Sequence, residues 1–223
     1  MNDSKSHTIN GKTKQHFNAI EIAVRRGDRL LLSGINFSLA PQKLLRIIGE
    51  NGSGKTSLLR VIAGLSEADA GELQWQGYNI NSSESYSQNL GYIGHRDGIK
   101  PMLTAIENLR FYQHLHQTNN EDIINQVLHK LNLLDHADIT AGLLSFGQRR
   151  RLAFARLLLA SQSLWLLDEP FTGIDVKGKK LIESICIEHL KNNGMIIMTH
   201  HGSLDDSQLN QYENQLDLTS AVT

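Results

Sequence analysis

Residues 49–56 read Gly-Glu-Asn-Gly-Ser-Gly-Lys-Thr and constrain the fold of this chain more than any other stretch. The largely apolar residues 43–48 before them are typical of a β-strand, and residues 57–63 repeat apolar side chains at helical spacing. A strand, a glycine-rich turn and a helix in this order form a loop whose backbone N–H groups bind phosphate. The positive end of the helix dipole strengthens the attraction. The stretch therefore predicts an α/β fold that binds a nucleotide.

The side chains of this loop have distinct expected roles. Lys55 should reach the β- and γ-phosphates, and the Thr56 hydroxyl should ligate Mg²⁺. Glycine allows the sharp backbone turns that bring several N–H groups to one side. The residues expected to contact the nucleotide here are Gly49, Asn51, Gly52, Ser53, Gly54, Lys55, Thr56 and Ser57.

Composition limits the classes of partner. The chain has 223 residues, with 22 Lys and Arg against 23 Asp and Glu, so no net field attracts nucleic acid and we expect no nucleic-acid partner. The single cysteine, Cys186, excludes an internal disulfide and fits a reducing compartment. No apolar run approaches the ~20 residues that span a membrane, and no signal peptide is visible. We expect a cytosolic protein, or one attached to something cytosolic.

The order of the elements indicates one α/β domain with a helical insertion. Strands are predicted at 18–24, 35–39, 43–48, 71–75, 90–93, 164–167 and 195–198. Helices are predicted at 57–63, from 104, from 121, at 148–160 and at 176–191. We therefore expect a disordered tail at 1–16, a single domain at 17–210, a helical subdomain at about 97–145 within it, and a polar tail at 211–223.

Two acids, Asp168 and Glu169, follow the continuous apolar run 164–167. Such a run is typical of a parallel strand that is buried on both faces, and carboxylates at its exit are costly unless a cation is near. Asp168 is expected to hold Mg²⁺, directly or through water. Glu169 is expected to orient the water that attacks the γ-phosphate, or to accept its proton.

Histidines follow the second buried strand, at His200 and His201. A histidine in this place can donate a hydrogen bond to a γ-phosphate and so distinguish ATP from ADP. We choose His200, because it is nearer the strand, while His201 remains the alternative.

Residues 144–148, Leu-Ser-Phe-Gly-Gln, precede another predicted helix. Ser145 and Gly147 at a helix N-terminus can form an anion site by the same physics as residues 49–56. Taken alone, the stretch is better explained as a capped helix start, because serine is a good N-cap.

These motifs in this order, around a helical insertion, resemble the ATP-binding cassette superfamily from about residue 17 to residue 201. The resemblance implies an ATPase with a RecA-like core, an antiparallel β subdomain and an inserted helical subdomain. It also implies a head-to-tail dimer with a second such subunit. Ser145, Gly147 and Gln148 of one copy would then contact the nucleotide held by Lys55 of the other, and Asp175 would lie in the loop that joins the two sites.

Residues 75–77, 88–90 with 93–95, 103–109 and 168–172 are further similar to the ATP-binding subunits of the haem exporters that serve cytochrome c maturation. That resemblance implies a permease partner, a peripheral position on the cytoplasmic face of the bacterial inner membrane, and haem as the transported or released species. We place the permease contact at about 97–108, where a helix start is exposed.

Three residues depart from the superfamily pattern. His95 stands where a glutamine usually contacts Mg²⁺ and the attacking water. The haem-exporter subunits resemble this chain in having a histidine in this place, and we count His95 as catalytic. Phe146 replaces a usually small residue, which predicts some steric cost where two copies meet. Arg26 lies near the usual position of an aromatic ring that stacks on adenine, and a guanidinium can stack in its place.

Two other functions share parts of this pattern. An ATPase that serves a transporter of a different substrate would carry the same motifs. An ATPase of this superfamily that acts on ribosomes or DNA would usually carry two cassettes or extra domains.

Overall fold

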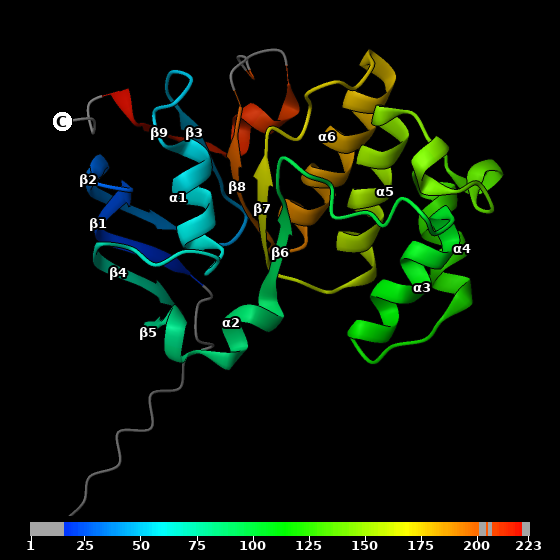
Figure 1. Ribbon diagram of the computed structural model, residues 1–223, viewed down its shortest axis with the longest axis horizontal. Coiled ribbons are helices and arrows are strands. Elements are labelled where there is room, and N and C mark those ends of the chain that lie inside the picture. The colour runs from blue at the N-terminus through cyan, green and yellow to red at the C-terminus, as the bar shows by residue number, and fades with distance from the viewer. Residues whose placement is uncertain (1–15, 201–203, 205–206, 220–223) are drawn as a thin grey trace, which may run out of the picture.

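The computed structural model describes residues 16–200, 204 and 207–219 of the chain. Within them the chain forms a four-stranded antiparallel sheet, ordered β2-β1-β4-β5, and a five-stranded parallel sheet, ordered β6-β7-β8-β3-β9 (Figure 1). The antiparallel strands are β1 (Phe17–Arg26), β2 (Arg29–Leu39), β4 (Ala70–Trp75) and β5 (Tyr78–Asn79). The parallel strands are β3 (Leu44–Ile48), β6 (Leu90–Ile93), β7 (Leu164–Asp168), β8 (Met195–Thr199) and β9 (Glu213–Asp217).

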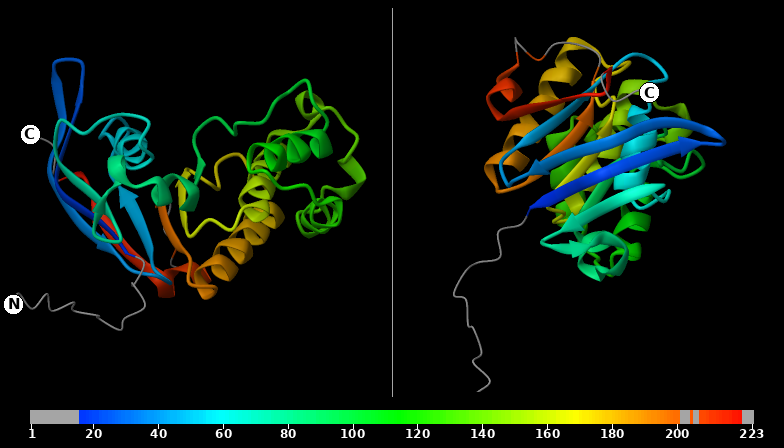
Figure 2. Two further views of the ribbon diagram at one scale, coloured as in Figure 1. Left: turned by 90° about the horizontal axis from the view of Figure 1, so that it is seen from below. Right: turned by 90° about the vertical axis from the view of Figure 1, so that its left-hand side faces the viewer.

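The molecule has two arms, as the left view of Figure 2 shows: one arm contains the sheets, and the other consists of helices. Helix α1 packs between the two sheets, where Leu58, Leu59 and Ile62 join one hydrophobic core. Helices α5 and α6 cover the other face of the parallel sheet and share a second core with α3 and α4. The helices are α1 (Lys55–Ile62), α2 (Glu84–Asn89), α3 (Ala105–Leu115), α4 (Glu121–Lys130), α5 (Phe146–Leu159) and α6 (Val176–Lys191).

Strand β7 lies between β6 and β8 in the parallel sheet. Each of its residues is buried, and alternate side chains enter the two cores, Leu166 on the α1 side and Leu167 on the α5 side. Burial on both faces explains why the strand has a continuous apolar run instead of an alternating pattern. The Asp168 side chain is 3% exposed at the carboxyl end of this strand.

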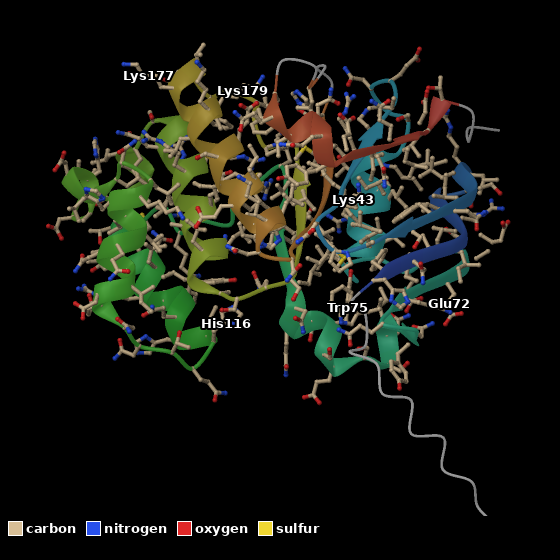
Figure 3. The ribbon with its side chains drawn as sticks, turned by 180° about the vertical axis from the view of Figure 1, so that it is seen from behind. Lys43, Glu72, Trp75, His116, Lys177 and Lys179 are labelled. Atoms are coloured by element: carbon tan, nitrogen blue, oxygen red, sulfur yellow. The ribbon has the colours of Figure 1, made fainter. Side chains whose placement is uncertain are left out.

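Helix α2 has no clear sequence signal, but its Tyr86 secures the junction between the sheets. The Tyr86 ring lies 5.8 Å from Trp75 and 5.9 Å from Phe17, and its hydroxyl donates a hydrogen bond to the carbonyl of Ile62. Trp75 is 1% exposed at the end of β4 and is labelled in Figure 3. Desolvation raises the pKa of the Tyr86 hydroxyl far above its usual range. The aromatic cluster therefore anchors the antiparallel sheet to α1.

The segment 211–223, expected to be a polar tail, instead supplies an edge strand. Strand β9 pairs in parallel with β3, and the following Leu218 is fully buried. Glu213 binds Arg46 of β3 in an ion pair whose side chains are only 3% and 9% exposed. The domain thus continues past residue 210, because one ion pair and one leucine fix a strand that has no apolar pattern. Apart from His16, the tail predicted at 1–16 lies outside the described residues, as do 220–223.

We expect Glu213→Ala to lower the free energy of unfolding by about 3–5 kcal/mol, because it removes the carboxylate that faces a buried guanidinium. Urea denaturation of the full chain measures this change. The control is Glu188→Ala, which breaks an ion pair with Lys130 whose side chains are 54% and 38% exposed and should cost less than about 1 kcal/mol. Equal losses in the two variants would contradict a structural role for the β9 ion pair.

Candidate nucleotide site

The loop between β3 and α1 has the geometry of a phosphate cradle. Gly52 and Gly54 adopt φ angles of 83° and 100°, a region that favours glycine, and Gly54 forms the N-cap of α1. Among the described residues, no side chain caps α1 and no acid lies in its first turn. The first N–H groups of the helix are therefore open to an anion at the positive end of the helix dipole.

Lys55 is the first residue of α1 and lies across this loop. Its Nζ donates hydrogen bonds to the carbonyl oxygens of Gly49 at 2.8 Å and Glu50 at 2.7 Å. Burial lowers the pKa of Lys55, and the negative charges of Glu169 and Asp168 oppose that shift. The ammonium group is thus already placed at the mouth of the loop.

The carboxyl end of β7 faces the same loop. Asp168 accepts hydrogen bonds from the Thr56 hydroxyl at 3.0 Å and from the Thr199 hydroxyl at 2.6 Å. Glu169 follows with a φ angle of 48°, and its N–H donates to the Thr199 hydroxyl at 2.9 Å. A positive φ in a non-glycine residue costs about 1–3 kcal/mol and marks a backbone that its surroundings hold in place. Thr199, fully buried in β8, was not predicted as a site residue and orients both acids.

A cavity of about 410 Å³ lies over this loop. The predicted site residues that line it are Asn51, Gly52, Gly54, Lys55, Thr56, Ser57, Arg26 and Glu169. Ser53 lines a second cavity, which shares Arg29, Asn51 and Gly52 with the first. Among the described residues no aromatic side chain lines the first cavity, whereas two arginines, Arg26 and Arg29, do.

Arg29 is a site residue that the sequence interpretation missed. It begins β2 and lines both cavities, whereas the sequence interpretation singled out only Arg26 in this stretch. The signal that could have found it is a second arginine three residues after Arg26, which pairs with Arg26 where β1 turns into β2.

The residues predicted to act on a second copy are not among the described residues that line this cavity. Ser145 and Gln148 form a capping box at the start of α5, with hydrogen bonds of 2.7 Å and 3.2 Å. Asp175 caps α6 by accepting a hydrogen bond from the N–H of Gly178 at 3.0 Å. Within one chain, all three side chains therefore cap helices.

Phe146 lies against Gly173. A Cβ atom at Gly173 would lie 2.7 Å from the Phe146 ring, so the ring occupies space that only glycine leaves. The side chain is 44% exposed. The bulky Phe146 side chain thus packs against a glycine of its own chain, where a larger residue would not fit.

The two histidines predicted as catalytic occupy different surroundings. His95 is exposed in the loop after β6. His200 follows β8 and meets the Phe171 ring edge to face, with centroids 5.3 Å apart. His201, the alternative to His200, lies outside the described residues.

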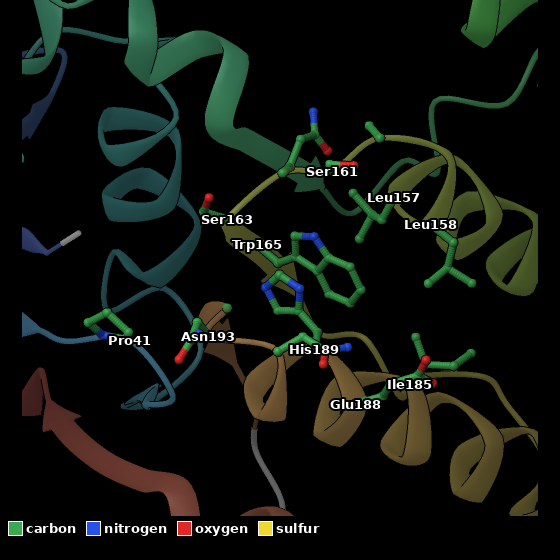
Figure 4. A pocket seen from close by; sticks show the side chains of 14 residues that line it. Pro41, Leu157, Leu158, Ser161, Ser163, Trp165, Ile185, Glu188, His189 and Asn193 are labelled. Carbon is green, nitrogen blue, oxygen red and sulfur yellow. The ribbon is translucent and has the colours of Figure 1, made fainter. Parts of the chain in front are cut away.

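A larger cavity, of about 740 Å³, lies between the C-terminal ends of α5 and α6 (Figure 4). The Trp165 and His189 rings stack at 3.8 Å within it, and burial lowers the pKa of His189 to about 4. No lysine or arginine lines it within the described part of the chain. It therefore lacks the cations that a triphosphate requires.

No helix among the described residues is both long and apolar enough to cross a membrane. Within the same residues, no group of three or more histidine, cysteine, aspartate or glutamate side chains could hold a metal ion.

The fold and this site define an ATP-hydrolysing domain of the ATP-binding cassette class. Residues 32–172 match the model of the ABC transporter family. A putative ABC transporter ATP-binding protein from Pyrococcus furiosus has the same fold, with a TM-score of 0.81 at 22% identity over 93% of this chain and 100% of that one. A nucleotide-free ATP-binding cassette from an ABC transporter gives a TM-score of 0.76 at 21% identity over 92% and 88%. The predicted fold class is confirmed.

Curated relatives narrow the family. The chain is 43% identical to the cytochrome c biogenesis ATP-binding export protein CcmA of Aliivibrio fischeri, over 80% of this chain and 88% of the relative. It is 41% identical to the protein of that name from Histophilus somni, over 87% and 90%. It is 45% identical to the protein of that name from Vibrio cholerae, over 79% of this chain and 86% of the relative. The chain belongs to the ABC transporter family and, within it, to the cytochrome c biogenesis ATP-binding export proteins.

Proposed function

We propose that this chain hydrolyses ATP to drive a membrane complex that handles haem for the assembly of c-type cytochromes. The observation that carries the proposal is identity of 41–45% to cytochrome c biogenesis proteins over most of both chains. The site supports it, because the phosphate loop and Glu169 line one cavity, and Asp168 binds the Thr56 hydroxyl of that loop. The chain would act at the cytoplasmic face of the bacterial inner membrane, with haem as the transported or released species.

The donors at the end of β7 fit Mg²⁺. The Thr56 hydroxyl and the Asp168 carboxylate lie 3.0 Å apart, and both supply the hard oxygen ligands that this ion prefers. A bound Mg²⁺ would neutralise phosphate charge during transfer. Thr199 would keep the Asp168 carboxylate aimed at Thr56 through its own 2.6 Å hydrogen bond.

In the proposed hydrolysis, Lys55 exchanges its two carbonyl partners for phosphate oxygens. Glu169 orients the attacking water or accepts its proton, since its carboxylate lines the cavity. His200 donates a hydrogen bond to the γ-phosphate, and His95 contacts the water from the loop after β6. Arg26 and Arg29 hold the base end of the nucleotide by stacking and charge.

A second copy, arranged head to tail, would complete the site. Ser145, Gly147 and Gln148 at the start of α5 lie outside their own chain's cavity, which supports a role at the cavity of a partner. Asp175 at the start of α6 would link the two nucleotides. ATP binding would close the two copies, and hydrolysis would open them and move the permease.

An exposed apolar pair lies at the proposed permease contact at 97–108, with one member in this segment and one in the loop beside it. Met102 is 86% exposed and Leu143 is 81% exposed. Backbone hydrogen bonds from Ala141 to Leu103 and from Gly142 to Pro101, of 2.8 Å and 2.9 Å, bring their two loops together. Exposed side chains of this size fit a surface that is covered by another protein.

Affinity purification of the tagged chain from membranes, with mass spectrometry and haem quantification, tests this function. We expect a permease and haem to co-purify, and we expect Met102→Asp or Leu143→Asp to reduce permease recovery by at least about tenfold without loss of basal hydrolysis. The control is Leu65→Asp, at a 56% exposed leucine after α1. A permease without haem would indicate another substrate, and recovery with ribosomes or DNA would overturn the proposal.

A further inference from the structure

Arg150 is a buried cation that connects three parts of the nucleotide site. It lies in the first turns of α5, three residues after Gly147, and is 2% exposed. Its guanidinium donates to the carbonyls of Gly94 at 2.9 Å, Asp168 at 2.6 Å, Glu169 at 3.0 Å and Pro170 at 3.4 Å, and to the Asp97 carboxylate at 2.8 Å. Arginine suits this position because its planar group offers five donors in a fixed geometry.

These acceptors belong to segments that carry proposed catalytic groups. Gly94 and Asp97 flank His95 in the loop between β6 and α3, and the other carbonyls surround Glu169 at the end of β7. Helix α5 contacts β6 on one side, and α3 and α4, here called the helical group, lie on its other side (Figure 1). One side chain thus joins the start of α5 to both catalytic segments.

The Glu169 backbone requires such support. Its φ of 48° is strained, and its carbonyl accepts from Arg150 while its N–H donates to Thr199. Buried carbonyls beyond the end of a strand ladder are costly without a donor. The Glu169 carbonyl also accepts a hydrogen bond from the Thr172 N–H at 3.2 Å, and the Glu169 carboxylate accepts one from the Thr172 hydroxyl at 3.0 Å. Arg150 adds the donor that comes from α5, so the position of the Glu169 backbone is coupled to that of α5.

The neighbouring Arg151 provides a comparison within the same helix. Its guanidinium donates to the carbonyls of Leu131 and Asn132, at 2.9 Å and 3.3 Å, both after α4 in the helical group. Arg151 therefore holds α5 to the helical group, whereas Arg150 holds α5 to the catalytic segments.

We propose that Arg150 is a positioning residue for ATP hydrolysis, which transmits movement of the helical group through α5 to Glu169 and the His95 loop. The inference rests on the proposed role of Glu169. Through Asp97 the same guanidinium fixes the start of the proposed permease contact. A displacement of α5 on permease movement therefore changes the position of the catalytic carboxylate.

The test uses Arg150→Gln, Arg150→Lys, Asp97→Asn and Arg151→Gln in the full chain, with steady-state ATP hydrolysis and binding of trinitrophenyl-ATP. We expect Arg150→Gln to lower kcat by about 10- to 100-fold, because small misplacements of reacting groups have effects of this size. KM and analogue affinity should change less than about threefold, because the loop 49–56 is untouched. Arg150→Lys should restore part of kcat, Asp97→Asn should lower it less, and Arg151→Gln should leave it within about threefold.

A second readout separates positioning from general destabilisation. In a Glu169→Gln background, Arg150→Gln should lower the residual rate less than about twofold, because both changes act on one group. Parallel losses of kcat and melting temperature in Arg150→Gln and Arg151→Gln would overturn the proposal. If Arg150→Gln does not fold, kcat of Arg150→Lys becomes the test. A wild-type kcat in Arg150→Lys would then overturn the proposed positioning role. A wild-type chain without ATPase activity would instead overturn the proposed function.

Discussion

Glu169→Gln is expected to reduce ATP hydrolysis by at least about 100-fold, the range typical of losing a general base. The carboxylate lines the nucleotide cavity at the exit of β7, and the amide has nearly the same shape without the basic oxygen. ATP affinity should stay within about threefold, because the amide removes no cation that holds the phosphates. The variant should therefore accumulate as a closed, ATP-bound dimer.

Phosphate release and size-exclusion chromatography with ATP measure the two effects. The control is Glu84→Gln, at an exposed acid in the first turn of α2, which should hydrolyse ATP at the wild-type rate. Wild-type turnover by Glu169→Gln would contradict its role as the base.

Lys55→Ala should weaken ATP binding by at least about 100-fold, since each charge-assisted hydrogen bond contributes about 1.5–3 kcal/mol and tenfold corresponds to about 1.4 kcal/mol. The ammonium group now binds the Gly49 and Glu50 carbonyls, and phosphate oxygens would replace them. The variant loses these contacts and the charge that faces the γ-phosphate.

Equilibrium dialysis with ATP measures the affinity. Lys43→Ala, at an exposed lysine that precedes β3, is the matched control and should bind like the wild type. Retained affinity in Lys55→Ala would show that the phosphates lie elsewhere.

The parts of the fold that follow local rules were predictable from the sequence. The glycine loop requires particular backbone angles, and β7 shows in its composition that both of its faces are buried. The capping box of α3, at Thr104 and Glu107, likewise depends on residues three apart and is present with both hydrogen bonds. Such features need no knowledge of distant contacts.

Features that depend on distant partners were not predictable. Strand β9 has a polar sequence and is fixed by Arg46, which lies 167 residues earlier than Glu213. Arg150 appeared as one of three successive arginines, and only the folded chain distinguishes it from Arg151. Charge and periodicity predict which face of a helix or strand is exposed to solvent. They do not predict which backbone carbonyls converge on a guanidinium.

Residues 144–148 show a limit of a different kind. Ser145 and Gln148 cap α5, as the simpler interpretation of the sequence expected. The proposed contact with the nucleotide of a second copy uses the same N-terminus, so the two interpretations are compatible. A helix start that is capped by side chains can still present its remaining N–H groups to an anion.

The central claim is that ATP hydrolysis by this chain serves the assembly of c-type cytochromes. Its most direct test is to replace the chain, in the cells that encode it, by Glu169→Gln and to measure haem covalently bound to c-type cytochromes. The account predicts that bound haem falls to background and returns when the wild-type chain is restored. Normal amounts of haem-bound cytochrome in cells that carry only the inactive variant would contradict it.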